Sequence, residues 1–171
     1  EESYGYLSGS YVRDKDAVVA SMLIAEMFAW YKSKGLTLFD ALTNIYKKYG
    51  YAKEALDSFT LEGKEGVEKI KNAMECLRKE VPERFGNTVI KAIRDYSAGM
   101  KTDIKTGLKE ALSLPKSDVL YFETEDNFWF CIRPSGTEPK IKIYYGVYAN
   151  SEEDSQKALE NLRNNVLLKL K

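Results

Sequence analysis

The sequence contains no histidine among its 171 residues. Without an imidazole, these residues cannot build a Ser-His-Asp triad or a Cys-His pair, and they cannot bind a metal ion through histidine. Phosphohistidine chemistry is excluded for the same reason. The composition therefore removes the large classes of enzyme whose acid, base or metal ligand is histidine.

Cysteine is scarce, with only Cys76 and Cys131. They lie far apart in the sequence, and no C-x-x-C spacing is present, which argues against a redox or zinc motif. We predict that both are buried free thiols in a reducing cytoplasm. A disulfide between them is the alternative.

The chain also lacks an excess of charge of either sign, because 26 basic residues balance 26 acidic ones. No net field draws it to nucleic acid or to anionic lipid. Its longest apolar run, residues 17–31, is shorter than the roughly 20 residues that cross a bilayer. We therefore expect a globular cytoplasmic protein without a nucleic-acid or membrane partner. Nothing at the start of the chain resembles a signal peptide, because it opens with Glu1-Glu2 and has no basic leader. The missing initiator methionine suggests a fragment.

The first strong helical pattern covers residues 17–30, and Asp14 is the residue that we expect to cap it. This segment is apolar on two faces, so both faces need a covering layer. The sequence before residue 50 offers no candidate strand for such a layer. We therefore expect that an upstream segment is missing, that the helix exposes apolar surface, and that the chain tends to self-associate.

The rest of the chain alternates between helical and strand patterns. Two more helices are expected at residues 37–49, with a capping box at Thr37 and Asp40 and a stop at Gly50, and at residues 64–81, ended by Pro82. Strands are expected at residues 51–61, 88–96, 119–124, 128–132 and 140–148, with a hairpin turn at Asp126 and Asn127. Residues 97–118 have no clear period, which predicts a long surface loop with a helical turn at 108–112. Ser151 is expected to cap a closing helix.

These patterns predict two parts. Residues 1–82 read as a mostly helical α/β remnant, and residues 83–171 as an α+β domain with a four-stranded antiparallel sheet and packed helices. We place the boundary at residues 82–87.

The segment Arg133-Pro134-Ser135-Gly136-Thr137-Glu138-Pro139 carries the clearest chemical signal. An arginine presents a planar fork of donors to two phosphate oxygens, hydroxyls add further hydrogen bonds, and glycine lets backbone N–H groups approach a ligand. The composition alone fits two interpretations equally, a phosphate-binding loop and an ordinary turn with a solvated arginine.

The same segment, followed by K-I-K-I-Y, closely resembles the C-terminal phosphate-binding loop of the α-D-phosphohexomutases, the phosphoglucomutase and phosphomannomutase superfamily. Two further stretches resemble that family: the E-E-S-Y-G opening is similar to its sugar-binding loop, and the R-D-K-D segment at residues 13–16 is similar to the stretch after that loop. The resemblance implies that residues 1–82 belong to mutase domain three and residues 83–171 to domain four, which is TBP-like. It favours phosphoglucomutase, while mannose or pentose phosphates remain alternatives.

The resemblance also implies what the chain lacks. No loop similar to T-A-S-H-N-P and no D-G-D-x-D motif occurs, and in the family these carry the transferring phosphoserine and the Mg²⁺ site. It implies that Mg²⁺ and a sugar 1,6-bisphosphate activator serve the full-length enzyme and that neither binds this fragment. The missing N-terminal mutase domains are then the partners of this chain, and the fragment alone is expected to be inactive.

The resemblance assigns no catalytic residue and no metal ligand to the fragment. It implies that the sugar hydroxyls contact Glu1, Ser3 and Lys15, and that the non-reacting phosphate of the phosphosugar contacts Arg133, Ser135, Gly136 and Thr137. The alternative function is a non-catalytic module that binds phosphosugars or other anions through the same loop.

Overall fold

The computed structural model describes residues 6–11, 13–61, 63–136 and 138–170. The chain forms two compact units, Glu1–Tyr49 and Gly50–Lys171. The helices are α1 (Ala17–Ser33), α2 (Leu38–Tyr49), α3 (Gly63–Lys79) and α4 (Glu152–Leu170). The strands are β1 (Tyr51–Thr60), β2 (Arg84–Phe85), β3 (Thr88–Asp95), β4 (Met100–Asp103), β5 (Lys109–Ala111), β6 (Leu120–Thr124), β7 (Trp129–Pro134) and β8 (Lys140–Ala149).

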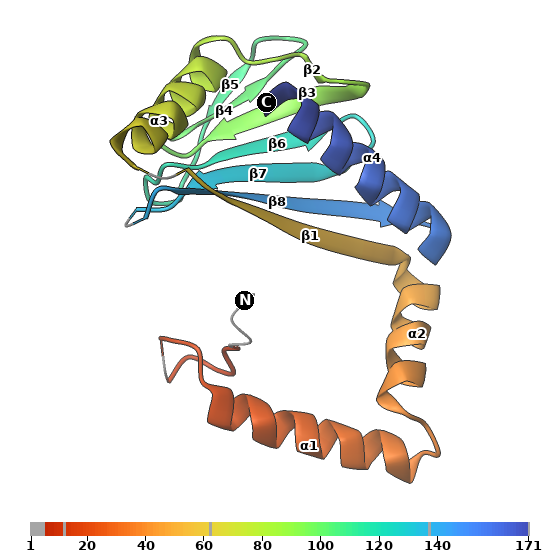
Figure 1. The fold of residues 1–171 in the computed structure, drawn as a ribbon. Coiled ribbons are helices and arrows are strands. Elements are labelled where there is room, and N and C mark those ends of the chain that lie inside the picture. Colours follow the sequence, from red (N-terminus) through yellow and green to blue (C-terminus); the bar gives the residue numbers. More distant parts are fainter. Residues whose placement is uncertain (1–5, 12, 62, 137, 171) are drawn as a thin grey trace. The chain divides into compact units, whose positions relative to one another are not determined.

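The second unit is built on one antiparallel sheet with the order β1-β8-β7-β6-β3-β4-β5, in which β2 pairs with β3 (Figure 1). The prediction of an antiparallel sheet is confirmed. The predicted number of four strands is wrong, because the sheet has eight. The expected strands at residues 88–96, 119–124, 128–132 and 140–148 form its centre, and the expected strand at 51–61 is its edge strand β1.

Residues 97–118 contain the hairpin of β4 and β5, where we had predicted a loop with a helical turn. Neither strand shows the alternation of buried and exposed positions that identifies a strand in a sequence, because β4 is half-buried throughout and β5 is exposed throughout. Backbone hydrogen bonds define both strands: β4 pairs with β3 and β5, and β5, at the edge of the sheet, pairs with β4. The sequence pattern of β4 and β5 therefore does not identify them as strands.

The hydrophobic core lies between one face of the sheet and the helices α3 and α4, which cover that face together (Figure 1). Alternate residues of the central strands supply the sheet side of the core, as the period of two requires. The fully buried members of this face include Phe122, Phe130, Ile132, Ile143 and Tyr145. They contact Met74 and Leu77 of α3 and Leu159, Leu162 and Val166 of α4 within one cluster.

The structure divides the chain at Tyr49 and Gly50, whereas the sequence suggested a boundary at residues 82–87. Strand β1 pairs with β8 along its whole length, and α3 covers the same sheet, so both elements belong to the second unit. The boundary expected from the sequence lies inside this unit, because the residue pattern changes there from a helical period to a strand period. Such a change of pattern indicates where one secondary-structure element ends and the next begins, but it does not indicate where a hydrophobic core ends.

In the first unit, the N-cap of α1 is Asp16, whose carboxylate accepts hydrogen bonds from the N–H groups of Val18 and Val19 at 2.9 and 3.1 Å. The predicted cap, Asp14, is wrong by two residues, and its carboxylate accepts from the N–H of Lys15. The capping box of α2 is confirmed. Thr37 Oγ1 accepts from the N–H of Asp40 at 3.1 Å, and Asp40 accepts from the N–H of Thr37 at 2.9 Å. The Thr37 hydroxyl, which donates to the Asp40 carboxylate at 2.6 Å, and the Thr37 N–H lower the pKa of Asp40.

Helix α1 presents most of its apolar side chains to solvent, and Ala20 is its one buried residue. The exposed set is Val18, Met22, Leu23, Ile24, Met27, Phe28 and Trp30. This exposure agrees with a helix apolar on two faces. The expected self-association stays a prediction. No helix within the described ranges combines the length and apolar character of a transmembrane span.

The contact between β1 and α4 includes a buried carboxylate. Asp57, on the helix-covered face of β1, is 7% exposed and accepts hydrogen bonds from two nitrogens of Arg163, at 2.7 Å from Nε. The hydrogen bonds to Asp57 and its charge raise the pKa of Arg163.

We expect Arg163→Met to lower the free energy of unfolding by about 1–3 kcal/mol, because it leaves a buried carboxylate without its donor. Urea unfolding of the chain measures this. The control is Lys157→Met, which breaks an exposed i,i+4 pair with Glu153 on the same helix and should cost less than about 0.5 kcal/mol. Adding Asp57→Asn to Arg163→Met should recover part of the loss. A double variant no more stable than the single one would contradict the account.

Candidate functional site

The segment singled out in the sequence connects β7 to β8. The N–H of Ser135 donates to the carbonyl of Lys140 at 2.8 Å and so extends the ladder beyond the last paired residue of β7. Inside the turn, the N–H of Glu138 donates to Ser135 Oγ at 3.3 Å, and the N–H of Lys140 donates to the carbonyl of Glu138 at 2.7 Å. The N–H of Leu61, just after β1, donates to the carbonyl of Pro139 at 2.8 Å. Hydrogen bonds between its own two ends and one from the residue after β1 therefore fix the conformation of the turn.

The structure brings three of the predicted phosphate residues together at this turn. Arg133 is exposed near the end of β7, Ser135 is half-buried, and Gly136 is exposed. Thr137 lies outside the described residues. No described atom lies within 4 Å of a Cβ built at Gly136, and no left-handed backbone angle is recorded there. The packing of the described residues therefore gives no reason for a glycine at this position.

The predicted sugar-binding residues are not brought to this turn by anything described. Glu1 and Ser3 lie outside the described residues. Lys15 is exposed and belongs to the first unit, so its position relative to the turn is not defined. Their assignment remains a prediction.

A cleft of about 350 Å³ adjoins the turn on the side of α3. Its walls come from the turn, from one side of α3, and from two loops at the end of the sheet. The lining residues of the turn are Pro134, Ser135, Glu138, Pro139 and Lys140. The opposite wall consists of Val67, Ile70, Lys71, Met74, Glu75 and Arg78 of α3, together with Ser97 and Asp118.

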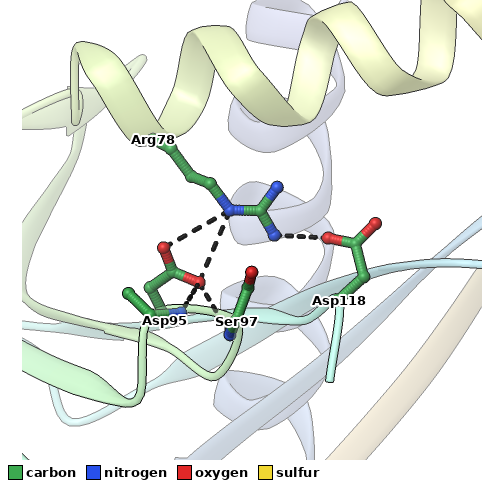
Figure 2. A network of polar contacts seen from close by, with 5 residues as sticks. Arg78, Asp95, Ser97 and Asp118 are labelled. Carbon is green, nitrogen blue, oxygen red and sulfur yellow. Dashed lines mark hydrogen bonds and ion pairs between the residues drawn. The ribbon is translucent and has the colours of Figure 1, made fainter. Parts of the chain in front are cut away.

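Arg78, in the wall of this cleft, forms ion pairs with two carboxylates (Figure 2). Its Nε lies 3.3 Å from Asp95, and its Nη2 donates to Asp118. Asp95 also accepts from the N–H of Ser97 at 2.9 Å. Burial opposes the charge of the guanidinium, but the hydrogen bonds and charges of Asp118 and Asp95 outweigh burial and raise the pKa of Arg78. Arg78 thus fastens α3 to the end of β3 and to the loop before β6.

The charges around the cleft are balanced in pairs. Besides the Arg78 network, Lys140 Nζ lies 3.0 Å from Glu138, and Lys71 Nζ lies 3.9 Å from Glu75. The Arg78 network cannot be predicted from sequence patterns, because its acidic partners are 17 and 40 residues away. We therefore assign Arg78 a role in positioning α3 and do not add it to the phosphate residues.

Both cysteines are free, as predicted. The prediction that both are buried is wrong for Cys76, which is exposed on α3 because the sheet-facing positions of that helix are Ile70, Met74 and Leu77. Cys131 is half-buried. Cys131 lies two residues before Arg133 on β7. Burial raises the pKa of the Cys131 thiol to about 11, against the lowering effect of the Arg133 charge. A thiol of this kind is a poor nucleophile near neutral pH.

Comparison with known proteins decides the family. Residues 67–168, more than half of the chain, match the family model for the C-terminal domain of phosphoglucomutase and phosphomannomutase. The chain belongs to the phosphoglucomutase/phosphomannomutase family. The resemblance inferred from the R-P-S-G-T-E-P turn is thereby confirmed, and the matched range includes that turn.

Curated relatives of this family member include bacterial phosphoglucomutases. It is 35% identical to that of Staphylococcus haemolyticus over 94% of its own length, and 39% identical to that of Staphylococcus saprophyticus over 98%. It spans 29% and 30% of those two proteins. Its fold is similar to part of the Paramecium phosphoprotein pp63/parafusin, a phosphoglucomutase, in the open form. That match has a TM-score of 0.61 and 19% identity over 99% of this chain and 29% of the other, and it supports the fold alone.

We expect Arg78→Met to lower the free energy of unfolding by about 1–2 kcal/mol, because Asp95 and Asp118 lose their common donor. The amide NMR signals of Ser97 and Ser135, on the two sides of the cleft, should shift with it. The control is Lys79→Met, at the next and exposed position of α3, which should change stability by less than about 0.5 kcal/mol. Equal stability of the two variants would contradict the role of the network.

Proposed function

We propose that this chain is the C-terminal part of a phosphohexomutase that interconverts hexose 1-phosphate and hexose 6-phosphate through a bisphosphorylated sugar. In this proposal the chain holds the substrate, and residues elsewhere in a full-length enzyme transfer the phosphate. Its contribution to the rate is then positioning, which reduces the entropic part of the barrier. The family membership supports the enzyme class, while the division of labour is inferred from the motifs.

The observation that carries the proposal is the turn between β7 and β8. It is fixed by backbone hydrogen bonds, it presents Arg133 and Gly136 to solvent, and it contains the hydroxyl of Ser135. The packing of the described residues explains neither the glycine nor the exposed arginine. A phosphate group that needs a guanidinium fork, a hydroxyl and close backbone N–H groups explains both.

The strength of binding follows from the number of contacts. Charge-assisted hydrogen bonds contribute roughly 1.5–3 kcal/mol each, and association costs about 4 kcal/mol or more. Three or four contacts therefore leave a dissociation constant on the order of 1 mM for the isolated chain. A weak grip suits a site that must release a bisphosphorylated intermediate so that it can turn round and present its other phosphate.

Magnesium and a sugar 1,6-bisphosphate activator belong in this proposal to the rest of a full-length enzyme. Within the described part of the chain, no group of three or more cysteine, aspartate or glutamate side chains is placed to hold a metal ion. No step proposed for this chain depends on the metal ion.

The alternative is a non-catalytic module that binds phosphosugars or anions through the same turn. Both functions require the turn to bind phosphate. They differ in the native gene: a reading frame that encodes an upstream serine loop favours the mutase, and one that starts near Glu1 favours the module.

Glucose 1-phosphate, glucose 6-phosphate and inorganic phosphate should each raise the unfolding temperature of the chain, whereas glucose should have a much smaller effect. At ten times the dissociation constant, binding adds about 1.4 kcal/mol of stability. Arg133→Met should abolish most of this gain, while Arg84→Met, at an exposed arginine of β2, should leave it intact. Differential scanning fluorimetry measures both. A gain that is equal in the two variants would contradict the proposed role of the turn.

The chain alone should not convert glucose 1-phosphate into glucose 6-phosphate. The motivating observation is the absence of the serine and metal motifs that the family uses for transfer. A dehydrogenase-coupled assay with the purified chain, with an intact phosphoglucomutase as positive control, measures the conversion. Turnover by the chain itself would overturn the proposed division of labour.

A further inference from the structure

Gly66 is a buried glycine inside helix α3, and the helix itself gives no reason for it. The backbone angle φ of Gly66 is not one of the positive values that favour glycine. After proline, glycine is the least favourable residue in the interior of a helix. A neighbouring part of the chain must therefore require that this position has no side chain.

The neighbour is the backbone of Leu61. A Cβ built at Gly66 would overlap the carbonyl group of Leu61 and would lie 2.9 Å from the Cβ of Leu61. A backbone carbonyl cannot turn aside as the end of a flexible side chain can. Any side chain at position 66 would therefore push α3 and Leu61 apart.

Leu61 is also in contact with the turn between β7 and β8. It follows the last residue of β1 directly, and its N–H donates to the carbonyl of Pro139 at 2.8 Å. The next residue, Lys140, accepts from the N–H of Ser135 at 2.8 Å. Backbone contacts alone therefore connect Gly66 to Ser135.

Helix α3 is a firm support for these contacts. Its residues Met74 and Leu77 belong to the hydrophobic core, and Ile70 is buried as well. Val67, the residue after Gly66, lines the same cleft as Pro139. The first turns of α3 therefore adjoin the turn between β7 and β8.

We propose that Gly66 is a positioning residue for phosphate binding: it lets α3 support the backbone of Leu61, whose N–H holds the carbonyl of Pro139. This inference rests on the proposed function of the turn. A turn that is held in its binding conformation before the ligand arrives loses less conformational entropy on binding. If the bond from Leu61 is lost, only a fraction of the molecules has a competent turn, and the dissociation constant rises by the inverse of that fraction.

The test is an amide NMR titration of the chain with inorganic phosphate at constant ionic strength, which gives a dissociation constant from the shift of Ser135. We expect Gly66→Ala to weaken binding about 3- to 10-fold, the range to which one net backbone hydrogen bond corresponds. The amide of Leu61 should also exchange faster with solvent, because it loses its acceptor.

The control for a general loss of stability is Gly107→Ala. Gly107 lies between β4 and β5, at the opposite edge of the sheet from β1, and a Cβ there would meet no described atom within 4 Å. Its φ of 71° disfavours alanine, so this variant should unfold at a lower urea concentration. Its dissociation constant for phosphate should nevertheless stay within about 2-fold of that of the unaltered chain.

A second variant removes the same hydrogen bond without a change in α3. Leu61→Pro has no N–H to donate and should weaken phosphate binding about as much as Gly66→Ala. Leu61→Ala keeps the N–H and should bind within about 2-fold of the unaltered chain. The double variant with Gly66→Ala and Leu61→Pro should bind no more weakly than Leu61→Pro alone, because both changes act through one bond. Leu61→Pro keeps the test valid if Gly66→Ala fails to fold.

The outcomes separate the two proposals. A Gly66→Ala chain that is less stable but keeps the dissociation constant of the unaltered chain has lost only a structural glycine. An unchanged constant in Leu61→Pro, or a double variant weaker than either single one, also overturns the inference. The function of the turn stays intact in these cases if Arg133→Met weakens binding. Absence of saturable phosphate binding by the unaltered chain contradicts both the proposed function and this inference.

Discussion

The register between β7 and β8 is the constraint on which the candidate site depends. It is fixed by the helix-covered face, where Phe130 and Ile132 of β7 lie opposite Tyr145 and Ile143 of β8 and all four are fully or almost fully buried. A slip by one residue would turn every side chain to the other face and would push Arg133 into the core. The apolar core therefore decides that Arg133 is exposed.

The other face of the same pair adds a steric lock. A Cβ at Gly146 would lie 2.2 Å from the indole of Trp129, its cross-strand partner, so the bulky ring fits only against a residue without a side chain. Two independent features thus specify one register. The turn that follows inherits its geometry from this pairing, and the hydrogen bond from Leu61 to Pro139 ties it to β1 as well.

The sequence predicted the parts of the fold in which side chains alternate or repeat strongly. The strand at residues 140–148 and the capping box at Thr37 are examples, because local residue types determine them. The hairpin of β4 and β5 was missed because these strands of four and three residues are defined by backbone hydrogen bonds and show no alternation of buried and exposed side chains. The Arg78 network was missed for a different reason, since only the folded chain brings α3 to the loop before β6.

In the candidate site, too, the contiguous residues could be predicted from the sequence and the contacts between distant residues could not. The R-P-S-G-T-E-P turn could be read from the sequence because its residues are contiguous, and Arg133, Ser135 and Gly136 required no tertiary information. Lys142 lies opposite Arg133 because of the register between β7 and β8. The alternation of residue types in the sequence predicts the face on which a side chain lies, but it does not predict the cross-strand partner.

The most direct test of the central claim, that the turn between β7 and β8 grips phosphate, is a crystal structure of the chain with glucose 1-phosphate. The account predicts that the phosphorus atom lies within about 4 Å of donor atoms of Arg133 and Ser135, as charge-assisted hydrogen bonds of about 2.7–2.9 Å require. Phosphate density that is absent from the turn, or present only in the cleft beside Lys71, would contradict the claim.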